Sequence, residues 1–329
     1  MKRIYVIEMG GTISAHGKDR LDLKDYTSGK YKGGDFLQSI PELETIASIT
    51  FDPFLHISST KVASEDWIRL RKKVIEALEE KNYDGVVITH GTNTLEETAY
   101  FLHLTVPSKK PIVLVGAQRP FTALSTDAHL NLVNAVRVAT SDEAIGRGVL
   151  VVLNDEISCA REVTKSNTYR LETFQSGQLG FLGYIDVDHK VHFYREPTRT
   201  HTHKSEFASL TIDALPDVEI TYSYAGATGH LIEHIANSGQ YKGIVTAGTG
   251  AGLCSPAEVE AMREAVKRGI VIVRSSRVGN GRVVPILPYE EDSFISGDNL
   301  LPQKARILLM VALLKYSDRS ELQHVFDTY

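Results

Sequence analysis

The stretch GVVITHGTNT, residues 85–94, joins a short apolar run at residues 85–89 to a polar loop that contains a glycine. The run is rich in Val and Ile and shows no polar alternation, which is typical of a strand buried on both faces of a parallel sheet. Similar runs recur at intervals long enough for a helix, at residues 4–8, 111–115, 149–153, 243–246 and 269–273. The spacing therefore predicts an α/β fold in which a mostly parallel sheet lies between helices.

Two of the intervening segments carry clear helix signals. Ser64 is placed to cap a helix with apolar residues on one face, namely Trp67, Leu70, Val74, Ile75 and Leu78. Residues 255–258, Ser-Pro-Ala-Glu, match a capping box with proline at the first helical position, and that helix should end near Lys267. The apolar segment 307–314 is much shorter than a membrane span of about 20 residues, so we expect a buried helix there.

The charge balance limits the kinds of partner that the protein can bind. Its 329 residues include 36 Lys and Arg against 41 Asp and Glu, a net charge of −5. Binding to phosphate groups depends largely on clustered basic residues, so we expect a small-molecule partner and neither nucleic acid nor a membrane. The two cysteines lie outside any CxxC pattern, and residues 1–11 lack the apolar core of a signal peptide, which together predict a cytoplasmic location.

The length favours two domains, since a typical domain has roughly 150 residues. Residues 194–216 are rich in Pro, Thr, Ser and His and show little apolar periodicity, as is usual for a linker. We therefore expect a larger N-terminal α/β domain at residues 1–205 and a smaller C-terminal parallel α/β domain at residues 206–329. His201 and His203 fall in this linker, where histidines are usually solvated.

Polar loops follow four of the expected strands in the first domain. They are Gly10-Gly11-Thr12-Ile13-Ser14, Thr89-His90-Gly91-Thr92-Asn93-Thr94, Gly116-Ala117-Gln118-Arg119-Pro120 and Asn154-Asp155-Glu156. Ligands bind at the carboxyl ends of parallel strands, so these loops should line one crevice. Gly11 would let the backbone approach a ligand closely, and Thr12 and Thr92 would each supply a hydroxyl. A helix beginning within residues 93–97 would favour a carboxylate or an oxyanion at its N-terminus.

These segments resemble the bacterial-type L-asparaginase family, whose signatures are GGTI and HGTDT. The chain reads GGTI at residues 10–13 and HGTNT at residues 90–94. The likeness continues at GAQRP (116–120), VTKSNT (163–168), VRSSRV (273–278) and PQKAR (302–306), so it spans nearly the whole chain. The resemblance implies hydrolysis of a side-chain amide by a threonine, with release of ammonia, an acyl-enzyme intermediate, and neither cofactor nor metal.

Carried over residue by residue, the resemblance implies four catalytic positions. Thr12 matches the nucleophile, Tyr26 matches a tyrosine on a flexible lid, and Thr92 and Lys165 match a second hydroxyl and its lysine partner. The lysine can act as a base only if burial or a nearby cation lowers its pKa toward neutrality. Taken singly, each residue also fits a simpler role: a Gly-Gly-Thr turn, a loop anchor, a helix cap and a surface charge.

The resemblance also implies positions that bind the substrate. Ser59 matches the serine that holds the α-carboxylate, and Thr60 follows it where the family commonly has glutamine. Ala117 matches a position whose backbone carbonyl receives the amide nitrogen.

The sequence departs from the family where the α-ammonium of the substrate is recognised. Asn93 replaces the aspartate of HGTDT, and further differences occur at Thr60, Lys61, Ala251 and Ile286. Charge-assisted hydrogen bonds are roughly twice as strong as neutral ones, so an asparagine should bind an ammonium more weakly. Our hypothesis is that the chemistry is retained while the preferred linear or cyclic amide has an α-amino group that is absent, acylated or in a ring. Ser59, with Lys61, would hold its carboxylate.

Three alternatives fit the same residues. The chain would be a genuine L-asparaginase with weaker α-ammonium binding, a non-catalytic binding protein on the same fold, or an amidase domain that supplies ammonia to a partner synthetase. Residues 248–253 resemble a dinucleotide loop only in part, because the spacing and the later acidic residue are missing. HLIEH at residues 230–234 fits a zinc-protease pattern, but Leu231, Ile232 and Ile235 indicate the core stripe of a packing helix.

The resemblance further implies a homotetramer, a dimer of close dimers, in which the second domain completes the site of a neighbouring subunit. Ala251 and Ile286 would be the contributions from that side, where the family has an asparagine and a glutamate. The shared wall of the site would then be less polar than in the family.

Overall fold

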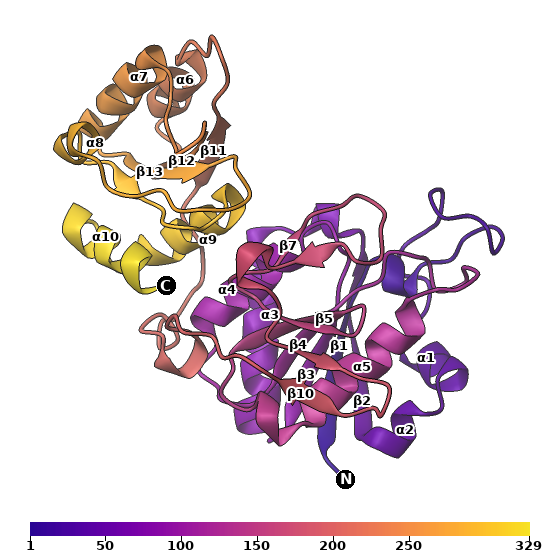
Figure 1. Ribbon diagram of the computed structural model, residues 1–329. Coiled ribbons are helices and arrows are strands. Elements are labelled where there is room, and N and C mark those ends of the chain that lie inside the picture. Colours follow the sequence, from indigo (N-terminus) through magenta and orange to yellow (C-terminus); the bar gives the residue numbers. More distant parts are fainter. The chain divides into compact units, whose positions relative to one another are not determined.

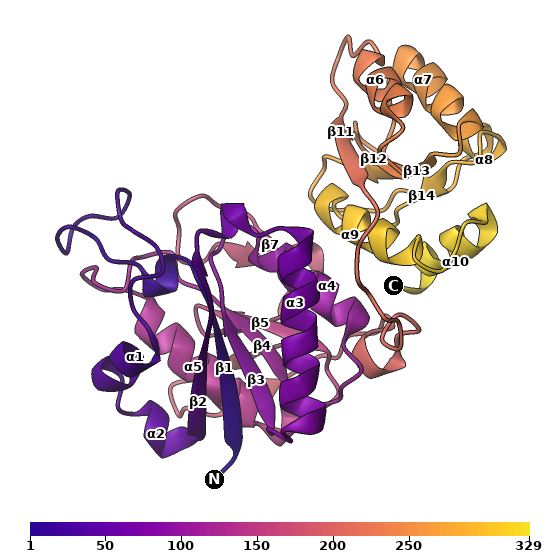
Figure 2. The same ribbon diagram turned by 180° about the vertical axis from the view of Figure 1, so that it is seen from behind.

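The protein folds into two compact units, Met1–Leu210 and Thr211–Tyr329, and the computed structural model describes all residues from 1 to 329. The division falls within the expected linker, a few residues after position 205. Each unit has its own sheet (Figures 1 and 2). The expected fold class, a mostly parallel sheet between helices together with a smaller parallel α/β unit, is confirmed.

Eight strands form the sheet of the first unit, in the order β10-β9-β6-β5-β4-β3-β1-β2. The parallel strands are β1 (Arg3–Gly10), β2 (Ser48–Ile57), β3 (Gly85–Thr89), β4 (Ile112–Val115) and β5 (Val149–Leu153). The antiparallel strands at one edge are β6 (Glu156–Cys159), β9 (Gly183–Ile185) and β10 (Val191–Phe193). A separate antiparallel ribbon joins β7 (Thr164–Lys165) to β8 (Phe174–Gln175).

The strands that the sequence predicts are those buried on both faces. All residues of β3, β4 and β5 are buried, so their sequences contain no polar alternation. The edge strand β2 was not expected, because it is only half-buried and contains Asp52 and Pro53. The antiparallel strands were also missed, since they have only three or four residues each.

Helices cover both faces of this sheet (Figures 1 and 2). One face carries α1 (Gly33–Ser39), α2 (Leu43–Ile46) and α5 (Ala128–Thr140), whose apolar side chains join the strands in one core cluster. The other carries α3 (Ser64–Ile75) and α4 (Leu95–Thr105). Single turns complete the unit: η1 (Thr12–Ser14), η2 (Ser59–Lys61), η3 (Glu76–Glu80), η4 (Asp142–Ala144), η5 (Gly177–Leu179) and η6 (Thr202–Lys204).

The start of α3 differs in one detail from the prediction. Ser64 is the first residue of the helix and Ala63 is the N-cap, so the predicted cap at Ser64 is wrong. The carboxylate of Asp66 accepts a hydrogen bond from the Ala63 backbone N–H (3.1 Å) and satisfies that donor instead. The apolar face of the helix forms as predicted, with Trp67 and Val74 among its buried residues.

The second unit has a four-stranded parallel sheet in the order β11-β12-β13-β14. Its strands are β11 (Val218–Tyr222), β12 (Gly243–Gly248), β13 (Val271–Ser276) and β14 (Ile295–Ser296). Its helices are α6 (His230–Ser238), α7 (Pro256–Lys267), α8 (Leu287–Glu291), α9 (Pro302–Ala312) and α10 (Arg319–Thr328). Within this unit, α6 and α7 lie on one face of the sheet and α9 on the other (Figure 1).

Two of the predicted helices of this unit are confirmed. Ser255 Oγ accepts from the Glu258 N–H (3.1 Å), while the Glu258 carboxylate accepts from the Ser255 N–H (2.9 Å), which is the capping box. Residues 307–312 of the apolar segment form the second half of α9 and are all buried, whereas Leu314 lies beyond the end of the helix and is exposed. No helix of the structure is both long and apolar enough to cross a membrane.

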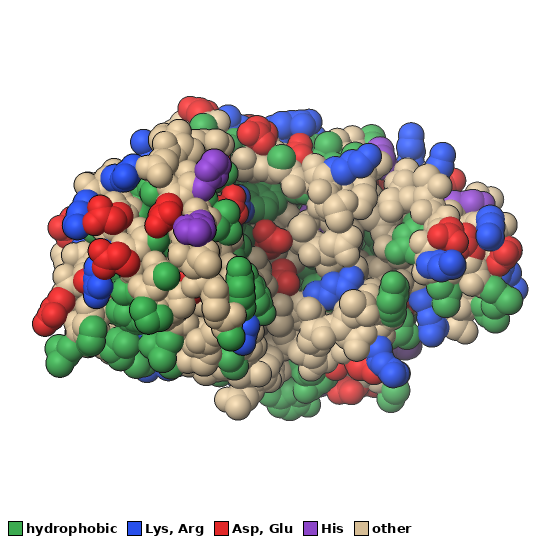
Figure 3. Space-filling view, turned by 90° about the horizontal axis from the view of Figure 1, so that it is seen from above, with side chains coloured by type: hydrophobic (Ala, Val, Ile, Leu, Met, Phe, Trp, Pro, Cys, Tyr) green, Lys and Arg blue, Asp and Glu red, His purple; other side chains and the backbone are tan.

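Two expectations about exposure are wrong. His201 is only 4 % exposed, because the linker folds back onto the first unit and the His201 ring lies 4.9 Å from that of His103 on α4. Leu231 is 58 % exposed, and the buried face of α6 consists of Ile232, Ile235 and Ala236. On the face shown in Figure 3, basic side chains are interspersed with acidic ones.

Candidate active site

The loop after β1 comes into direct contact with the loop after β3. Gly11 has φ +86°, and a Cβ built on it would lie 2.3 Å from Gly91 Cα. A Cβ on Gly91 would in turn lie 2.7 Å from Ser59 Oγ. Three loops that are distant in sequence can therefore meet only because two of the contacting residues are glycines.

Thr12 lies at the start of η1, immediately after this contact. Its side chain is largely buried, and its Oγ1 lies 3.0 Å from the hydroxyl oxygen of Tyr26. Tyr26 belongs to the loop of residues 15–32, which is closed at its base by paired backbone hydrogen bonds between His16 and Thr27 (2.9 and 3.0 Å). The structure thus brings the expected nucleophile and the expected lid tyrosine into hydrogen-bond contact.

Thr92 and Lys165 form a second pair. The Lys165 Nζ donates a hydrogen bond to Thr92 Oγ1 (2.8 Å) and lies 3.5 Å from Asn93 Oδ1. Burial lowers the pKa of Lys165 from its ordinary value. The lysine is therefore more readily deprotonated than an exposed one, which is the property that a catalytic base requires.

Glu96 is a site residue that the sequence analysis missed. It is buried in the first turn of α4, and its Oε1 accepts from the Thr164 hydroxyl (3.1 Å) and from the Lys165 backbone N–H (3.3 Å). These bonds attach the short strand β7 to the helix that follows Thr92. An acidic residue in a first helical turn is visible in the sequence, but it is ordinarily explained by the helix dipole alone.

Ser59 lies at the start of η2, at the end of the unexpected strand β2. Its Oγ accepts from the Asn93 backbone N–H (3.2 Å), and its carbonyl accepts from the Thr94 hydroxyl (2.8 Å). Ser59 is buried, whereas Thr60 and Lys61 are exposed, and the Thr60 hydroxyl lies 2.9 Å from that of Ser58. Of the three neighbouring candidates, only Ser59 is tied to the Thr92 loop by these bonds.

Ala117 is held next to Thr92 by the loop after β4. A Cβ built on Gly116 would lie 3.0 Å from Thr92 Cγ2, and Asn131 Nδ2 donates to the Gly116 carbonyl (3.0 Å). The carboxylate of Asp127 accepts the next two backbone N–H groups, those of residues 118 and 119, at 2.9 Å each. The backbone on both sides of Ala117 is therefore fixed.

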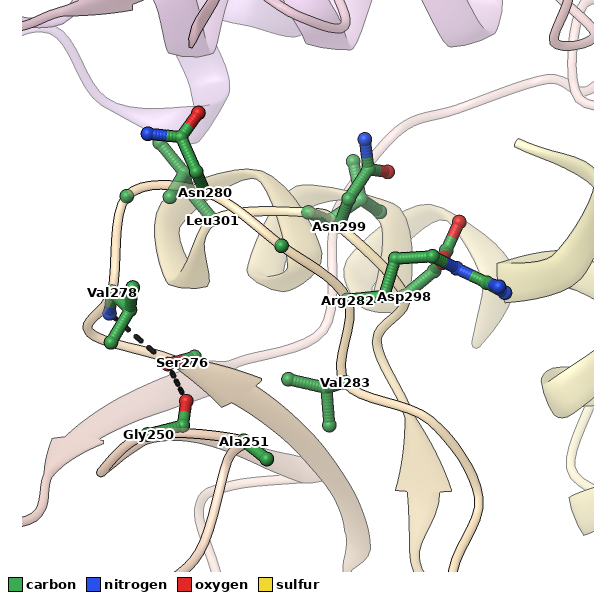
Figure 4. Close-up of a pocket in the computed structure, with 13 residues that line it drawn as sticks. Gly250, Ala251, Ser276, Val278, Asn280, Arg282, Val283, Asp298, Asn299 and Leu301 are labelled. Atoms are coloured by element: carbon green, nitrogen blue, oxygen red, sulfur yellow. Dashed lines mark hydrogen bonds and ion pairs between the residues drawn. The ribbon is translucent and has the colours of Figure 1, made fainter. Parts of the chain in front are cut away.

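Ala251 and Ile286 belong to the second unit. Ala251 is exposed and lines a cavity of about 260 Å³ at the carboxyl ends of β12 and β13 (Figure 4), while Ile286 lies outside this cavity as the N-cap of α8. The buried Arg274 was not anticipated. Its guanidinium donates to the carbonyls of Ala251 (3.3 Å) and Val284 (3.5 Å), so it joins the two loops that carry these residues.

Comparison with known proteins agrees with this fold and identifies the family. The family model "Asparaginase, N-terminal" matches residues 3–199, and "Glutaminase/Asparaginase C-terminal domain" matches residues 217–326. The chain belongs to the asparaginase/glutaminase family of amidohydrolases, and it is a hydrolase that acts on amide C–N bonds.

Several relatives are similar over the full chain. It is 42 % identical over 329 residues to "L-asparaginase 2" of Bacillus subtilis, covering 100 % of this chain and 87 % of that protein. It is 41 % identical to "Glutaminase-asparaginase" of Pseudomonas fluorescens, covering 100 % and 91 %. The crystal structure of "Probable Cytoplasmic L-asparaginase from Campylobacter jejuni" superposes with a TM-score of 0.95 at 40 % identity, covering 100 % of both chains.

Proposed function

We propose that the protein releases ammonia from a small, carboxylate-bearing amide through an acyl-enzyme on Thr12, and that asparagine is not its preferred substrate. The observation that carries the proposal is the pairing of two hydroxyls with two titratable partners. Thr12 Oγ1 lies 3.0 Å from the Tyr26 hydroxyl, and Thr92 Oγ1 lies 2.8 Å from Lys165 Nζ. The contact between Gly11 and Gly91 places both pairs on adjoining loops.

The proposed reaction has two halves. Thr12 Oγ1 attacks the amide carbonyl carbon and gives up its proton, the C–N bond breaks, and the nitrogen leaves as ammonia after accepting a proton. Water then attacks the Thr12 ester, releasing the carboxylic acid and restoring the hydroxyl. Tyr26 touches Thr12 and is suited to move its proton, while neutral Lys165 with Thr92 is suited to take a proton from water.

Ser59 is suited to bind the substrate carboxylate. Its Oγ already accepts the Asn93 N–H, so its own proton is available to donate to an anion. The backbone carbonyl of Ala117 is suited to receive the amide nitrogen, because the loop on either side of it is fixed. Gly11 and the nearby Thr60 and Lys61 would complete this side of the pocket.

The altered substrate preference rests on Asn93. Its Oδ1 lies 3.5 Å from the Lys165 Nζ, so the neutral oxygen that could accept from a substrate ammonium already faces a lysine amine. An aspartate at this position would offer the ammonium a formal charge, and charge-assisted bonds are about twice as strong as neutral ones. An amide without a free α-amino group loses nothing from this exchange.

Substrate competition tests the proposal. We expect kcat/KM for succinamate, which lacks the α-amino group, to exceed that for asparagine. Asn93→Asp should raise kcat/KM for asparagine and not that for succinamate. Asn82→Asp, the same change at an exposed residue of the first unit, serves as the control. A strong preference of the wild type for asparagine, or no gain from Asn93→Asp, would contradict the altered preference.

A second candidate is a genuine L-asparaginase with weaker α-ammonium binding. It is favoured by the relatives that carry that name and by the acceptor oxygen that Asn93 retains. The same comparison of substrates decides between the two. If no amide in a broad panel yields ammonia above the Thr12→Ala background, the chain is a non-catalytic binding protein instead.

We also infer a cytoplasmic homotetramer, a dimer of close dimers, in which Ala251 and Ile286 of the second domain (206–329) contribute to the site of a neighbouring subunit. The similarity to the Campylobacter jejuni protein, which is described as cytoplasmic, and the two free cysteines support the location. Light scattering should give four times the chain mass of 36.4 kDa. A monomer with full activity would contradict the shared site.

A further inference from the structure

His90 follows β3 directly and is fully buried beside the loop that carries Thr92. Its backbone N–H donates to the carbonyl of Val115 on β4 (2.8 Å). In its ring, Nδ1 lies 2.7 Å from the Gly91 carbonyl oxygen, and Nε2 lies 2.9 Å from the Thr98 hydroxyl oxygen. Trp67 Nε1 lies 2.9 Å from the same hydroxyl. The side chains of Trp67, Thr98 and His90 and the Gly91 carbonyl therefore form one buried chain of hydrogen bonds.

The direction of each hydrogen bond in this chain is determined by chemistry. A carbonyl oxygen only accepts and an indole N–H only donates, so His90 Nδ1 carries a proton and Thr98 Oγ1 accepts from Trp67. Burial lowers the pKa of His90 to about 4, so the ring has no second proton near neutral pH. His90 Nε2 is therefore an acceptor, and the single hydroxyl proton of Thr98 is directed at it.

We propose that His90 is a positioning residue, which orients the Gly91–Thr92 peptide through its Nδ1–H and whose tautomer is set by Thr98 and Trp67. The peptide unit is planar, so a bond that holds the Gly91 carbonyl also fixes the direction of the Thr92 N–H. The inference rests on the function proposed for Thr92.

Gly91 has little freedom to relieve a change in this orientation. It is packed between Gly11, whose added Cβ would lie 2.3 Å from Gly91 Cα, and the Ser59 side chain, 2.7 Å from a Cβ on Gly91 itself. A rotation of the Gly91–Thr92 peptide would move the Thr92 hydroxyl relative to Lys165 Nζ. The buried chain of hydrogen bonds that ends at the Gly91 carbonyl thus controls the geometry of the Thr92–Lys165 pair.

The tautomer is tested directly by nuclear magnetic resonance of the full chain with ¹⁵N-labelled histidine, assigned with His90→Gln. We expect protonated Nδ1 and unprotonated Nε2, unchanged from about pH 6 to pH 8, where an ordinary histidine titrates. A proton on Nε2, or a titration in this range, overturns the proposal. The measurement needs no turnover, so a lack of amidase activity would count against the proposed function and leave this result standing.

Kinetics of matched variants test the consequence. Thr98→Val removes the hydroxyl that donates to His90, and Thr98→Ser retains it. Thr105→Val makes the same change at a buried threonine of α4 whose hydroxyl donates to the Phe101 carbonyl of the same helix (2.8 Å). We expect Thr98→Val to lower kcat about tenfold, less than the ~100-fold cost of a 1 Å misplacement, with KM within about twofold. Thr98→Ser and Thr105→Val should stay within about twofold of wild type.

Equal kcat values for Thr98→Val and Thr105→Val would overturn the proposal, as would a loss in melting temperature alone. If Thr98→Val does not fold, Trp67→Phe removes the other donor and keeps an aromatic ring at this buried position. It should lower kcat and populate the second tautomer of His90 in the same spectra. An unchanged tautomer with unchanged kcat would again overturn the proposal.

Discussion

The side-chain nitrogen of Lys165 lies 2.8 Å from the hydroxyl oxygen of Thr92, although 73 positions separate the two residues in the chain. Lys165 reaches this position from the short strand β7, which is attached to α4 through the carboxylate of Glu96. Burial at this point lowers the pKa of the lysine.

Removal of the Lys165 amine should show in the pH–rate profile. Because the pKa of Lys165 is lowered, its neutral fraction grows with pH through an ionisation below the ordinary value of about 10.4. We therefore expect kcat to rise with pH through such an ionisation in the wild type. Lys165→Met should lower kcat at least about 100-fold and abolish the rise of kcat with pH. Lys165→Arg should not restore that rise, since a guanidinium does not deprotonate. A Lys165→Met profile parallel to that of the wild type would exclude Lys165 as the base.

Replacement of the candidate nucleophile should stop ammonia release. Thr12→Ala removes the oxygen that is proposed to form the ester, so we expect kcat to fall by more than about 10⁴-fold, as for other nucleophile deletions. Thr12→Ser should retain part of the activity. Thr140→Ala, at a threonine that bonds the backbone of α5 (2.8 Å to the Arg137 carbonyl), is the control. Comparable rates in Thr12→Ala and Thr140→Ala would assign the chemistry to another residue.

Neutralising Glu96 should weaken the hydrogen bonds that position Lys165, while the lysine itself is retained. Glu96→Gln keeps an oxygen acceptor but weakens both bonds to β7, because hydrogen bonds to a charged group are stronger than neutral ones. We expect kcat to fall about tenfold with a smaller change in KM, as when the support of a positioned group is weakened. Glu97→Gln, at the next residue of α4, should leave kcat close to the wild-type value. Equal effects of the two variants would show that Glu96 has no special role in the site.

Adding a side chain where the Gly11 loop contacts the Gly91 loop should lower both the stability and the activity of the protein. Gly11→Ala places a Cβ 2.3 Å from Gly91 Cα at a backbone φ of +86°, so we expect a loss of more than about 2 kcal/mol of unfolding free energy. Gly34→Ala is the matched control. No atom lies within 4 Å of its added Cβ, and alanine in a helix is favoured over glycine by about 0.5–1 kcal/mol. Calorimetry should therefore show shifts of opposite sign, and a harmless Gly11→Ala would refute the close contact.

Glu8 should make stability fall as the pH rises. It is 3 % exposed on β1, and burial raises its pKa from 4.5 to about 7. The contribution of Glu8 to the free energy of unfolding is fully present below about pH 4.5 and is lost as the pH rises to about 7. Between these values the folded state holds a proton that the unfolded state releases. Glu8→Gln should stabilise the protein at pH 8 by up to about 3 kcal/mol, since each pKa unit corresponds to about 1.4 kcal/mol.

Urea unfolding at two pH values checks this expectation. At pH 4 the Glu8→Gln variant and the wild type should have equal free energies of unfolding. Glu79→Gln, at an exposed glutamate of the same unit, is the control and should match the wild type at both values. A stabilisation by Glu8→Gln that is the same at pH 4 and pH 8 would rule out an effect of ionisation.

Much of the fold could be predicted from the sequence because burial on both faces leaves a compositional mark. The runs that became β3 and β5 have the bounds that the sequence predicts, and the capping box at Ser255 forms as expected. Strand β2 was missed, because an edge strand tolerates Asp52 and Pro53 and so lacks the continuous apolar composition of a strand buried on both faces. His201 was wrongly expected to be solvated, since its neighbours in sequence do not reveal that the chain folds back onto α4.

The sequence by itself determined the class of fold, the membership in the asparaginase/glutaminase family and the residues that are candidates for the chemistry, because these depend on local pattern and on motif. Only the tertiary structure decided which of them meet: Thr12 with Tyr26, Thr92 with Lys165, and Ser59 with the Asn93 backbone. It also decided the hydrogen-bond partners of Glu96 and His90, which include groups on other elements. The reason is physical: a pKa, a tautomer and a hydrogen-bond direction depend on burial and on contacts across the sheet, and neither is set by the neighbouring residues in the chain.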